Sequence, residues 1–208
     1  DMVLGKNETN LGDTERNNKA INTLFDWMLY LNLPIVFGLM SYGLFQVTIQ
    51  SYTASEWIGL SLSAGILLAT NGINVAHELG HRQSFLERTM SKALYIPCLY
   101  MHFYIEHNFG HHMKVATPDD GATAKYNQSV YAFWVRSVSK QYIDAWKKQM
   151  ELLSAKSRSF FSFYNDMLWY HLIQPLYLLF VLILFVPPLV VLRLFLILLL
   201  LLLRLLFF

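Results

Sequence analysis

The sequence predicts an all-α integral membrane protein, a transmembrane helical bundle with a cytoplasmic histidine-rich metal site. Three observations predict this. Hydrophobic residues make up 55% of the 208 positions and charged residues only 14%, which is unlike a soluble domain. Residues 20–81 and 159–192 contain no Lys or Arg, so the basic residues lie in blocks between long apolar runs. Histidines cluster directly after one of these runs.

The composition also excludes two classes of protein. A nucleic-acid-binding protein gathers its basic residues on one face or groove, whereas here they separate apolar segments, so we expect no nucleic-acid partner. The single cysteine, Cys98, excludes a disulfide scaffold and a thiolate metal cluster.

Three segments are long and apolar enough to cross a membrane. A bilayer core of about 30 Å requires roughly 20 apolar residues in a helix. Residues 24–47, 57–76 and 167–191 meet this requirement. Pro34 lies inside the first span and predicts a kink there rather than an end, because proline is tolerated in spanning helices.

The charge pattern around the first two spans predicts their orientation. The loop at residues 48–56 contains no basic residue. Basic residues lie outside this pair of spans instead: Lys6, Arg16, Lys19, Arg82, Arg88 and Lys92. Because basic residues favour the cytoplasmic side, both outer ends of the helical hairpin are expected in the cytoplasm.

The remaining segments are shorter or more polar. Residues 93–105 are apolar but too few to cross, which predicts an interfacial or re-entrant segment lying against the bundle. Residues 114–158 are rich in Lys and Arg and are expected to be cytoplasmic. They include an amphipathic spacing at Val138, Tyr142, Ala145, Trp146, Gln149 and Leu152.

The last 23 residues differ from the rest of the chain. Residues 1–185 are interpreted as one membrane domain, and residues 186–208 as a leucine-rich tail of uncertain origin. This tail lacks the small residues with which spanning helices usually pack on their neighbours. It is interpreted as a lipid-facing helix, a truncated or frame-shifted end, or a poorly determined stretch. The opening residues carry no signal peptide pattern, and we expect the natural start upstream.

Five of the seven histidines form two motifs, HELGH at residues 77–81 and EHNFGHH at residues 106–112. Residues four apart lie on the same face of an α-helix, so His77 and His81 can present two imidazoles to one point. His107 and His111 are expected to repeat that geometry. His112 is expected to point away from them, toward a second metal or a neighbouring group.

Two such pairs favour a metal site over the ordinary alternative, in which histidines near a membrane surface are merely hydrated. Imidazole suits Zn, Fe, Cu and Ni, so the ligand type does not select the metal. Glu78 and Glu106 are candidate catalytic or ligand carboxylates, or else solvated helix ends. Asn74, Asp119 and Asp120 are candidates to orient the imidazoles, although Asp119 and Asp120 also fit an ordinary turn.

Other charged and histidine side chains have simpler interpretations. His102 and His171 are expected to be structural. Arg82 and Lys114 are expected to reach the membrane interface with their charged ends.

HExxH alone is also the pattern of zinc peptidases, with the glutamate as general base. An intramembrane zinc protease would explain His77, Glu78 and His81. It would need a third ligand on a later span, and it would leave the EHNFGHH motif without a role.

The two motifs together resemble membrane-bound histidine-rich di-iron enzymes, namely fatty acyl desaturases, fatty acid hydroxylases and alkane monooxygenases. The stretch NVAHELGHR at residues 74–82, which contains the HELGH motif, and the stretch HFYIEHNFGHH are most similar to the alkane 1-monooxygenase branch. The stretches VATPDDGATA, YAFWVRSV and LGKNETN also resemble that branch. Gly121 departs from the pattern, which usually has proline there.

This resemblance implies nine histidines that hold two irons. Five match here, His77, His81, His107, His111 and His112, while the other four belong to two later motifs that this sequence does not contain. The chain is therefore expected to be an incomplete fatty acid desaturase-like domain, and the activity of such a fragment is open.

The resemblance also implies a reaction and its partners. The reaction is O₂-dependent hydroxylation of a terminal methyl group of an n-alkane to a primary alcohol, in a bacterial inner membrane. A rubredoxin-type protein would supply electrons, and the basic stretch at residues 136–158 could attract it. Three alternatives stay open: a fatty acyl desaturase or hydroxylase, an intramembrane zinc protease, and a non-catalytic membrane fragment.

Overall fold

The computed structural model describes residues 23–185, and this part of the chain is helical and contains no strand. The leucine-rich tail at residues 186–208, the end of the third expected span and the opening segment at residues 4–10 lie outside the described residues. The all-α fold class is confirmed. Three helical stretches are long and apolar enough to cross a membrane: Thr23–Ile49, Ala54–Gly80 and Asp166–Phe185.

The first span consists of α2 (Thr23–Tyr30) and α3 (Asn32–Ile49). The break at Leu31 lies one turn before Pro34, which has no N–H to donate to the Tyr30 carbonyl. Hydrogen bonds continue on either side, from Leu31 N to Trp27 O at 3.0 Å and from Ile35 N to Leu31 O at 3.2 Å. The proline therefore interrupts the helix without ending it.

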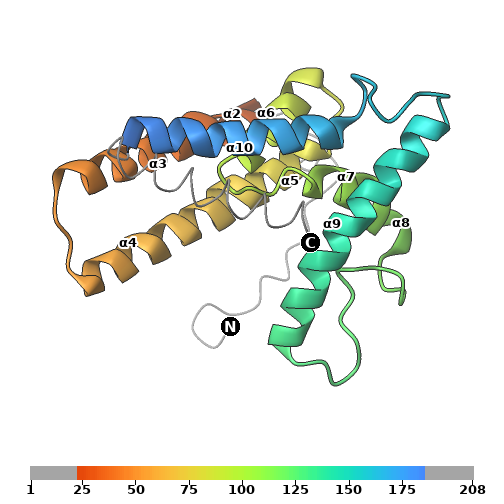
Figure 1. The fold of residues 1–208 in the computed structure, drawn as a ribbon, viewed down its shortest axis with the longest axis horizontal. Helices are drawn as coiled ribbons and strands as arrows, with labels where there is room; N and C mark the ends of the chain where they lie inside the picture. Colours follow the sequence, from red (N-terminus) through yellow and green to blue (C-terminus); the bar gives the residue numbers. More distant parts are fainter. Residues whose placement is uncertain (1–22, 186–208) are drawn as a thin grey trace, which may run out of the picture.

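The second span consists of α4 (Ala54–Leu67), a π-helix η1 (Leu68–Asn74) and α5 (Val75–Gly80). It begins with a capping box, in which Thr53 Oγ1 accepts from Glu56 N at 3.4 Å and Glu56 Oε2 accepts from Thr53 N at 2.7 Å. It ends within the HELGH motif. The third span is α10 (Asp166–Phe185), which runs alongside α3 (Figure 1).

Shorter helices lie at the histidine end of the spans. They are α6 (Phe85–Tyr95), α7 (Phe103–Glu106), the π-helix η2 (His107–His111) and α8 (His112–Lys114). The apolar stretch at residues 93–105 is thus the end of α6, a turn and the start of α7. It packs against the bundle, with Leu94, Tyr95 and Ile105 at most 1% exposed.

The long helix α9 (Val130–Ser154) crosses the other helices at a steep angle near the start of α10 (Figure 1). It contains the amphipathic spacing expected from the sequence. Ala145 and Gln149 are buried in it, whereas Val138 and Tyr142 are exposed.

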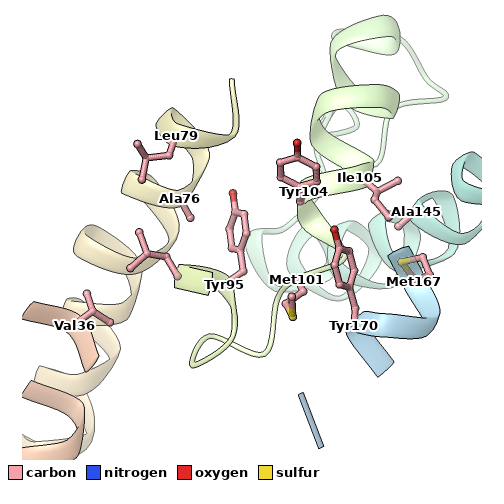
Figure 2. Close-up of a cluster of buried hydrophobic side chains, with 11 residues drawn as sticks. Val36, Ala76, Leu79, Tyr95, Met101, Tyr104, Ile105, Ala145, Met167 and Tyr170 are labelled. Carbon is pink, nitrogen blue, oxygen red and sulfur yellow. The ribbon is translucent and has the colours of Figure 1, made fainter. Parts of the chain in front are cut away.

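Most of the buried core lies at the histidine end of the bundle, although the core also includes Val36 in the first span. It joins α5, α6, α7, α9 and α10 through Leu79, Tyr95, Ile105, Ala145 and Met167 (Figure 2). An ion pair between Lys92 and Asp166, with Nζ and Oδ2 2.9 Å apart, ties α6 to α10. By contrast, most side chains of the three spans are not buried within the protein, as expected for surfaces that face lipid. The core therefore stabilises the region that carries the histidine motifs.

Candidate metal centre

The HELGH motif forms the end of α5, with His77 on the helix and His81 directly after it, one helical turn apart. Their Nε2 atoms are 3.1 Å apart and their ring centroids 4.5 Å apart. The helix α5 is also bonded to α6, because Ser91 Oγ of α6 donates to the Ala76 carbonyl at 2.6 Å. Gly80 permits this close packing, since a Cβ there would lie 3.1 Å from Ser91 Oγ and 3.5 Å from Asn108 Nδ2.

The EHNFGHH motif brings two further imidazoles to the same point. His107 Nε2 lies 3.2 Å from His81 Nε2, and His112 Nε2 lies 3.0 Å from His107 Nε2. The prediction that His112 points away was wrong. The cause is the π-helix η2: its i→i+5 hydrogen bonds turn the chain more slowly than an α-helix, so the residue five positions after His107 returns to the same side.

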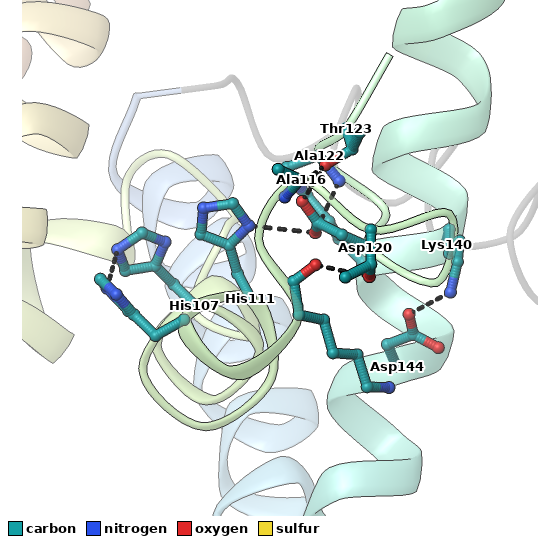
Figure 3. Close-up of polar contacts among 12 residues, drawn as sticks. His107, His111, Ala116, Asp120, Ala122, Thr123, Lys140 and Asp144 are labelled. Atoms are coloured by element: carbon teal, nitrogen blue, oxygen red, sulfur yellow. Dashed lines mark hydrogen bonds and ion pairs between the residues drawn. The ribbon is translucent and has the colours of Figure 1, made fainter. Parts of the chain in front are cut away.

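His111 lies beside His107, as the spacing of four predicts, with its ring stacked on that of His107 at a centroid distance of 5.2 Å. Its Nδ1 lies 3.0 Å from Asp120 Oδ1, and Figure 3 shows its ring directed at that carboxylate. Asp120 is 2% exposed and also accepts from Ala122 N at 3.0 Å and Thr123 Oγ1 at 2.6 Å. The carboxylate is therefore fixed and can hold the orientation of His111.

The converging nitrogens fit a bound cation. Two nitrogens that bind one ion at about 2.1 Å lie about 3.0 Å apart at right angles and about 3.4 Å apart at tetrahedral angles. The separations here are 3.0, 3.1 and 3.2 Å. The ligand atoms of His77, His81 and His107 lie within 4.8 Å of one another. Burial lowers the pKa of His107 to about 3, so this imidazole is neutral, as a metal ligand must be.

The two glutamates of the motifs do not point at this convergence. Glu78 is exposed, and its Oε1 lies 3.4 Å from Arg82 NH2, while Arg82 NH1 lies 3.3 Å from Asp26 Oδ1. Glu106 is 2% exposed, and its Oε2 has no hydrogen-bond partner among residues 23–185. Burial raises the pKa of Glu106 to about 7. It borders a cavity of about 40 Å³ that Asp120 and Asp144 also line.

The other candidates lie at the edge of the site or outside it. Asn74, at the end of η1, and Asp119 are both exposed. His102 is buried, with its ring against those of Tyr100 and Tyr142 at centroid distances of 4.6 and 5.3 Å. His171 Nε2 lies 2.6 Å from Tyr142 OH. Neither His102 nor His171 reaches the converging nitrogens.

Sequence reasoning missed two features of the site. One is the pair of π-helices, η1 before the HELGH motif and η2 within the EHNFGHH motif. Short π-helical segments are frequent at functional sites, and the adjacent pair His111 and His112 offered both the four-residue and the five-residue spacing from His107. The other is Asp26, whose ion pair with Arg82 connects the first span to the HELGH motif.

The fold and this site together define a helical integral membrane protein whose histidines converge at one end of its spanning helices. Residues 54–208 match the family model described as fatty acid desaturase. The chain belongs to the fatty acid desaturase family.

Individual relatives are named as monooxygenases. Alkane 1-monooxygenase 1 of Alcanivorax borkumensis is 33% identical over 184 residues, which cover 88% of this chain and 44% of the relative. Alkane 1-monooxygenase of Ectopseudomonas oleovorans is 36% identical over 79% of this chain and 41% of the relative. The hydroxylase component of xylene/toluene monooxygenase of Pseudomonas putida is 30% identical over 64% of this chain and 37% of the relative. The chain thus spans less than half the length of these relatives.

Proposed function

We propose that the five motif histidines contribute to a di-iron site that hydroxylates the terminal methyl group of n-alkanes or similar apolar chains to a primary alcohol. One observation carries this proposal: His107 Nε2 lies 3.2 Å from His81 Nε2 and 3.0 Å from His112 Nε2, so two separate motifs meet at one point. The names of the relatives support alkanes as the substrate class.

Two bound irons would supply the chemistry for splitting O₂ next to an unactivated C–H bond. One oxygen atom enters that C–H bond, and the other leaves as water after two electrons and two protons are taken up. The protein orients the ligands. His77, His81, His107 and His112 would contribute Nε2, and Asp120 would hold the ring of His111. The exposed apolar surfaces of the spans would let the substrate arrive from the lipid.

The orientation and the partner are part of the same proposal. The site would lie on the cytoplasmic side of a bacterial inner membrane. The loop between the first two spans lacks basic residues, whereas the segments outside this pair of spans contain several. A rubredoxin-type donor would approach the basic residues of α9, where Arg136, Lys140 and Lys147 lie on one side of the helix. Glu78 and Glu106 are proposed as acid–base or supporting carboxylates, with Asn74 and Asp119 at the periphery.

An intramembrane zinc protease is the alternative from another class. Its general base would be Glu78, directed at a water on the metal. In this protein the Glu78 carboxylate pairs with Arg82, and the second motif joins the HELGH histidines. Both observations favour the oxygenase. A desaturase would use the same ligands and differ only in its product, and an inert fragment would bind no metal.

The experiment combines metal analysis with product analysis. The 208-residue protein and its His107→Ala variant are purified in detergent, loaded with Fe(II) or Zn(II) without oxygen, desalted and analysed by mass spectrometry for metal. Membranes that contain the protein are then given octane, O₂, NADH, a rubredoxin and its reductase. Products are separated by gas chromatography.

We expect iron to be retained, to be lost in His107→Ala, and 1-octanol to form. Zinc retained equally by both proteins, with cleavage of a membrane peptide, would favour the protease. An alkene product would favour a desaturase, and absence of both metals would contradict any metalloenzyme function for this chain.

A further inference from the structure

The helix α9 turns two different surfaces to its surroundings along its length. A buried row runs through the helix and consists of Ser137, Gln141, Ala145, Gln149 and Leu153. An apolar row in its first half is exposed instead: Tyr131 is 73% exposed, Trp134 57%, Val135 72% and Val138 51%. Tyr142, at 39%, ends this row. We call Tyr131, Trp134, Val135, Val138 and Tyr142 the apolar stripe.

The apolar stripe and the buried part of the second half lie on the same side of the helix. Tyr131 and Gln149 are 18 positions apart, which is about five full turns. Gln149 is 4% exposed and Tyr131 is 73% exposed. The side of α9 that packs against the bundle in the second half of the helix is therefore exposed in the first half, which extends beyond the bundle.

Basic residues occupy the opposite side. Arg136, Lys140 and Lys147 are separated by four and seven positions, so they align along the helix away from the apolar stripe. One carboxylate lies among them, Asp144, with Oδ2 2.5 Å from Lys140 Nζ and Oδ1 3.8 Å from Lys147 Nζ. An apolar side with tryptophan and tyrosine opposite a lysine- and arginine-rich side is typical of helices that lie in a membrane surface.

The position of α9 fits this arrangement. Figure 1 shows α9 crossing steeply at the end of α10 where that span begins. At this junction Tyr142 OH lies 2.6 Å from His171 Nε2, and the rings of Trp146 and His171 are 5.2 Å apart. His171 lies in the second turn of the span, so the apolar stripe runs directly onto the membrane-facing surface of α10.

We propose that α9 is an interfacial helix whose apolar stripe is immersed in the lipid bilayer. Its opposite side is covered near Thr123, whose carbonyl accepts from Arg136 NH2 at 2.6 Å, and faces water at Lys147. The occupant of the stripe is lipid, because the stripe is continuous with the surface of a spanning helix and backed by basic residues that favour anionic headgroups. The proposal does not depend on the reaction or on the metal. It would fix the depth of the histidine end of the bundle in the membrane.

The experiment measures the surroundings of a nitroxide spin label at two positions of the same helix. In a Cys98→Ser background, Val135→Cys places the label on the apolar stripe and Lys147→Cys places it on the basic side. The comparison is matched, because Val135 is 72% exposed and the Lys147 side chain 70% exposed. The protein is reconstituted in phosphatidylglycerol and phosphatidylethanolamine vesicles, and collisions with O₂ and with water-soluble chromium oxalate are measured by electron paramagnetic resonance.

At position 135 we expect frequent collisions with O₂ and rare ones with chromium oxalate, and the reverse at position 147. The ratio of the collision rate with O₂ to the collision rate with chromium oxalate should differ by about tenfold between the two positions, as expected for lipid against water. Equal access of chromium oxalate to both would overturn the proposal. Rare collisions with both reagents at position 135 would also overturn it, because they would mean that protein, such as a second copy, covers the stripe. Val138→Cys on the same stripe replaces Val135→Cys if that variant does not fold.

Discussion

The two histidine motifs reach one point with different backbone geometries. In the HELGH motif His77 lies on the α-helix α5 and His81 directly follows its last residue in α-helical conformation, and a spacing of four aligns their rings. In the EHNFGHH motif the chain forms the π-helix η2, and a spacing of five aligns His107 with His112. His111, at the spacing of four, stacks on His107 and directs its Nδ1 at Asp120.

This difference teaches that a histidine spacing predicts convergence only together with the helix type. Because the π-helix turns more slowly, the histidines of the second motif face two directions. His107 and His112 face the first motif, and His111 Nδ1 faces the fixed carboxylate of Asp120. A regular α-helix would have directed His112 elsewhere. At the proposed di-iron site, one motif would therefore contribute to two coordination positions.

The largest effect should come from removing His107, the imidazole that lies between the motifs. In His107→Ala the remaining Nε2 atoms of His77 and His81 form one pair, and His112 loses its neighbour at 3.0 Å. Loss of a direct ligand should weaken the affinity for the first Co(II) or Fe(II) equivalent by more than about 100-fold, since loss of an outer partner alone costs about 10- to 100-fold.

Isothermal titration with Co(II) under nitrogen measures this loss. His102→Ala is the control, because His102 is buried away from the cluster between Tyr100 and Tyr142. If both variants bind Co(II) as the unchanged protein does, His107 does not join the motifs through a metal.

The second prediction separates the two geometries directly. His112→Ala should weaken binding of the first Co(II) equivalent by about 100-fold, whereas His111→Ala should weaken it by less than about 10-fold, because only His112 lies beside His107 Nε2. The visible absorption of bound Co(II) provides the titration signal. A larger loss of affinity in His111→Ala than in His112→Ala would mean that the EHNFGHH motif binds the metal with the geometry of a regular α-helix.

The fold was predictable because its signals are compositional. Long apolar runs without Lys or Arg identified the three spans, and within the described residues their ends lie within four residues of those in the structure. The effect of Pro34 also followed from local chemistry, since a missing N–H interrupts a helix wherever it occurs.

The site was predictable only in part. The residue types of both motifs and Asp120 followed from the sequence, but the direction of His112 depended on η2, and no propensity distinguishes a π-helical turn from an α-helical one. The surroundings of α9 were not predictable either. The spacing of apolar residues in α9 indicates one apolar side. Whether the rest of the protein covers Val138 and Tyr142 on that side depends on where the helix extends beyond the bundle.

The third prediction concerns the carboxylate that holds His111. Asp120→Asn keeps the shape of the side chain but removes the charge that favours His111 Nδ1–H as a donor at 3.0 Å. We expect about a 10-fold loss in affinity for the second metal equivalent, the low end of the range for outer partners of a ligand. Asp119→Asn is the matched control, since the neighbouring Asp119 is exposed. Equal losses in the two variants would mean that the loop charge acts over a distance.

The smallest effect should come from Gly80, which lets the HELGH helix approach α6. A methyl group in Gly80→Ala would lie 3.1 Å from Ser91 Oγ, and that hydroxyl cannot yield freely because it donates to the Ala76 carbonyl at 2.6 Å. Crowding of this kind should cost about 1 kcal/mol, seen as a lower midpoint of thermal unfolding in detergent. Gly65→Ala on the same span meets no atom within 4 Å and should show no loss. Ser91→Ala should reduce the cost of Gly80→Ala in the double variant, because it removes the crowded oxygen. If the costs of Gly80→Ala and Ser91→Ala simply add in the double variant, the contact between α5 and α6 is not what requires glycine at position 80. Another neighbour, such as Asn108, whose Nδ2 would lie at 3.5 Å from the added methyl group, then sets the spacing of the two motifs.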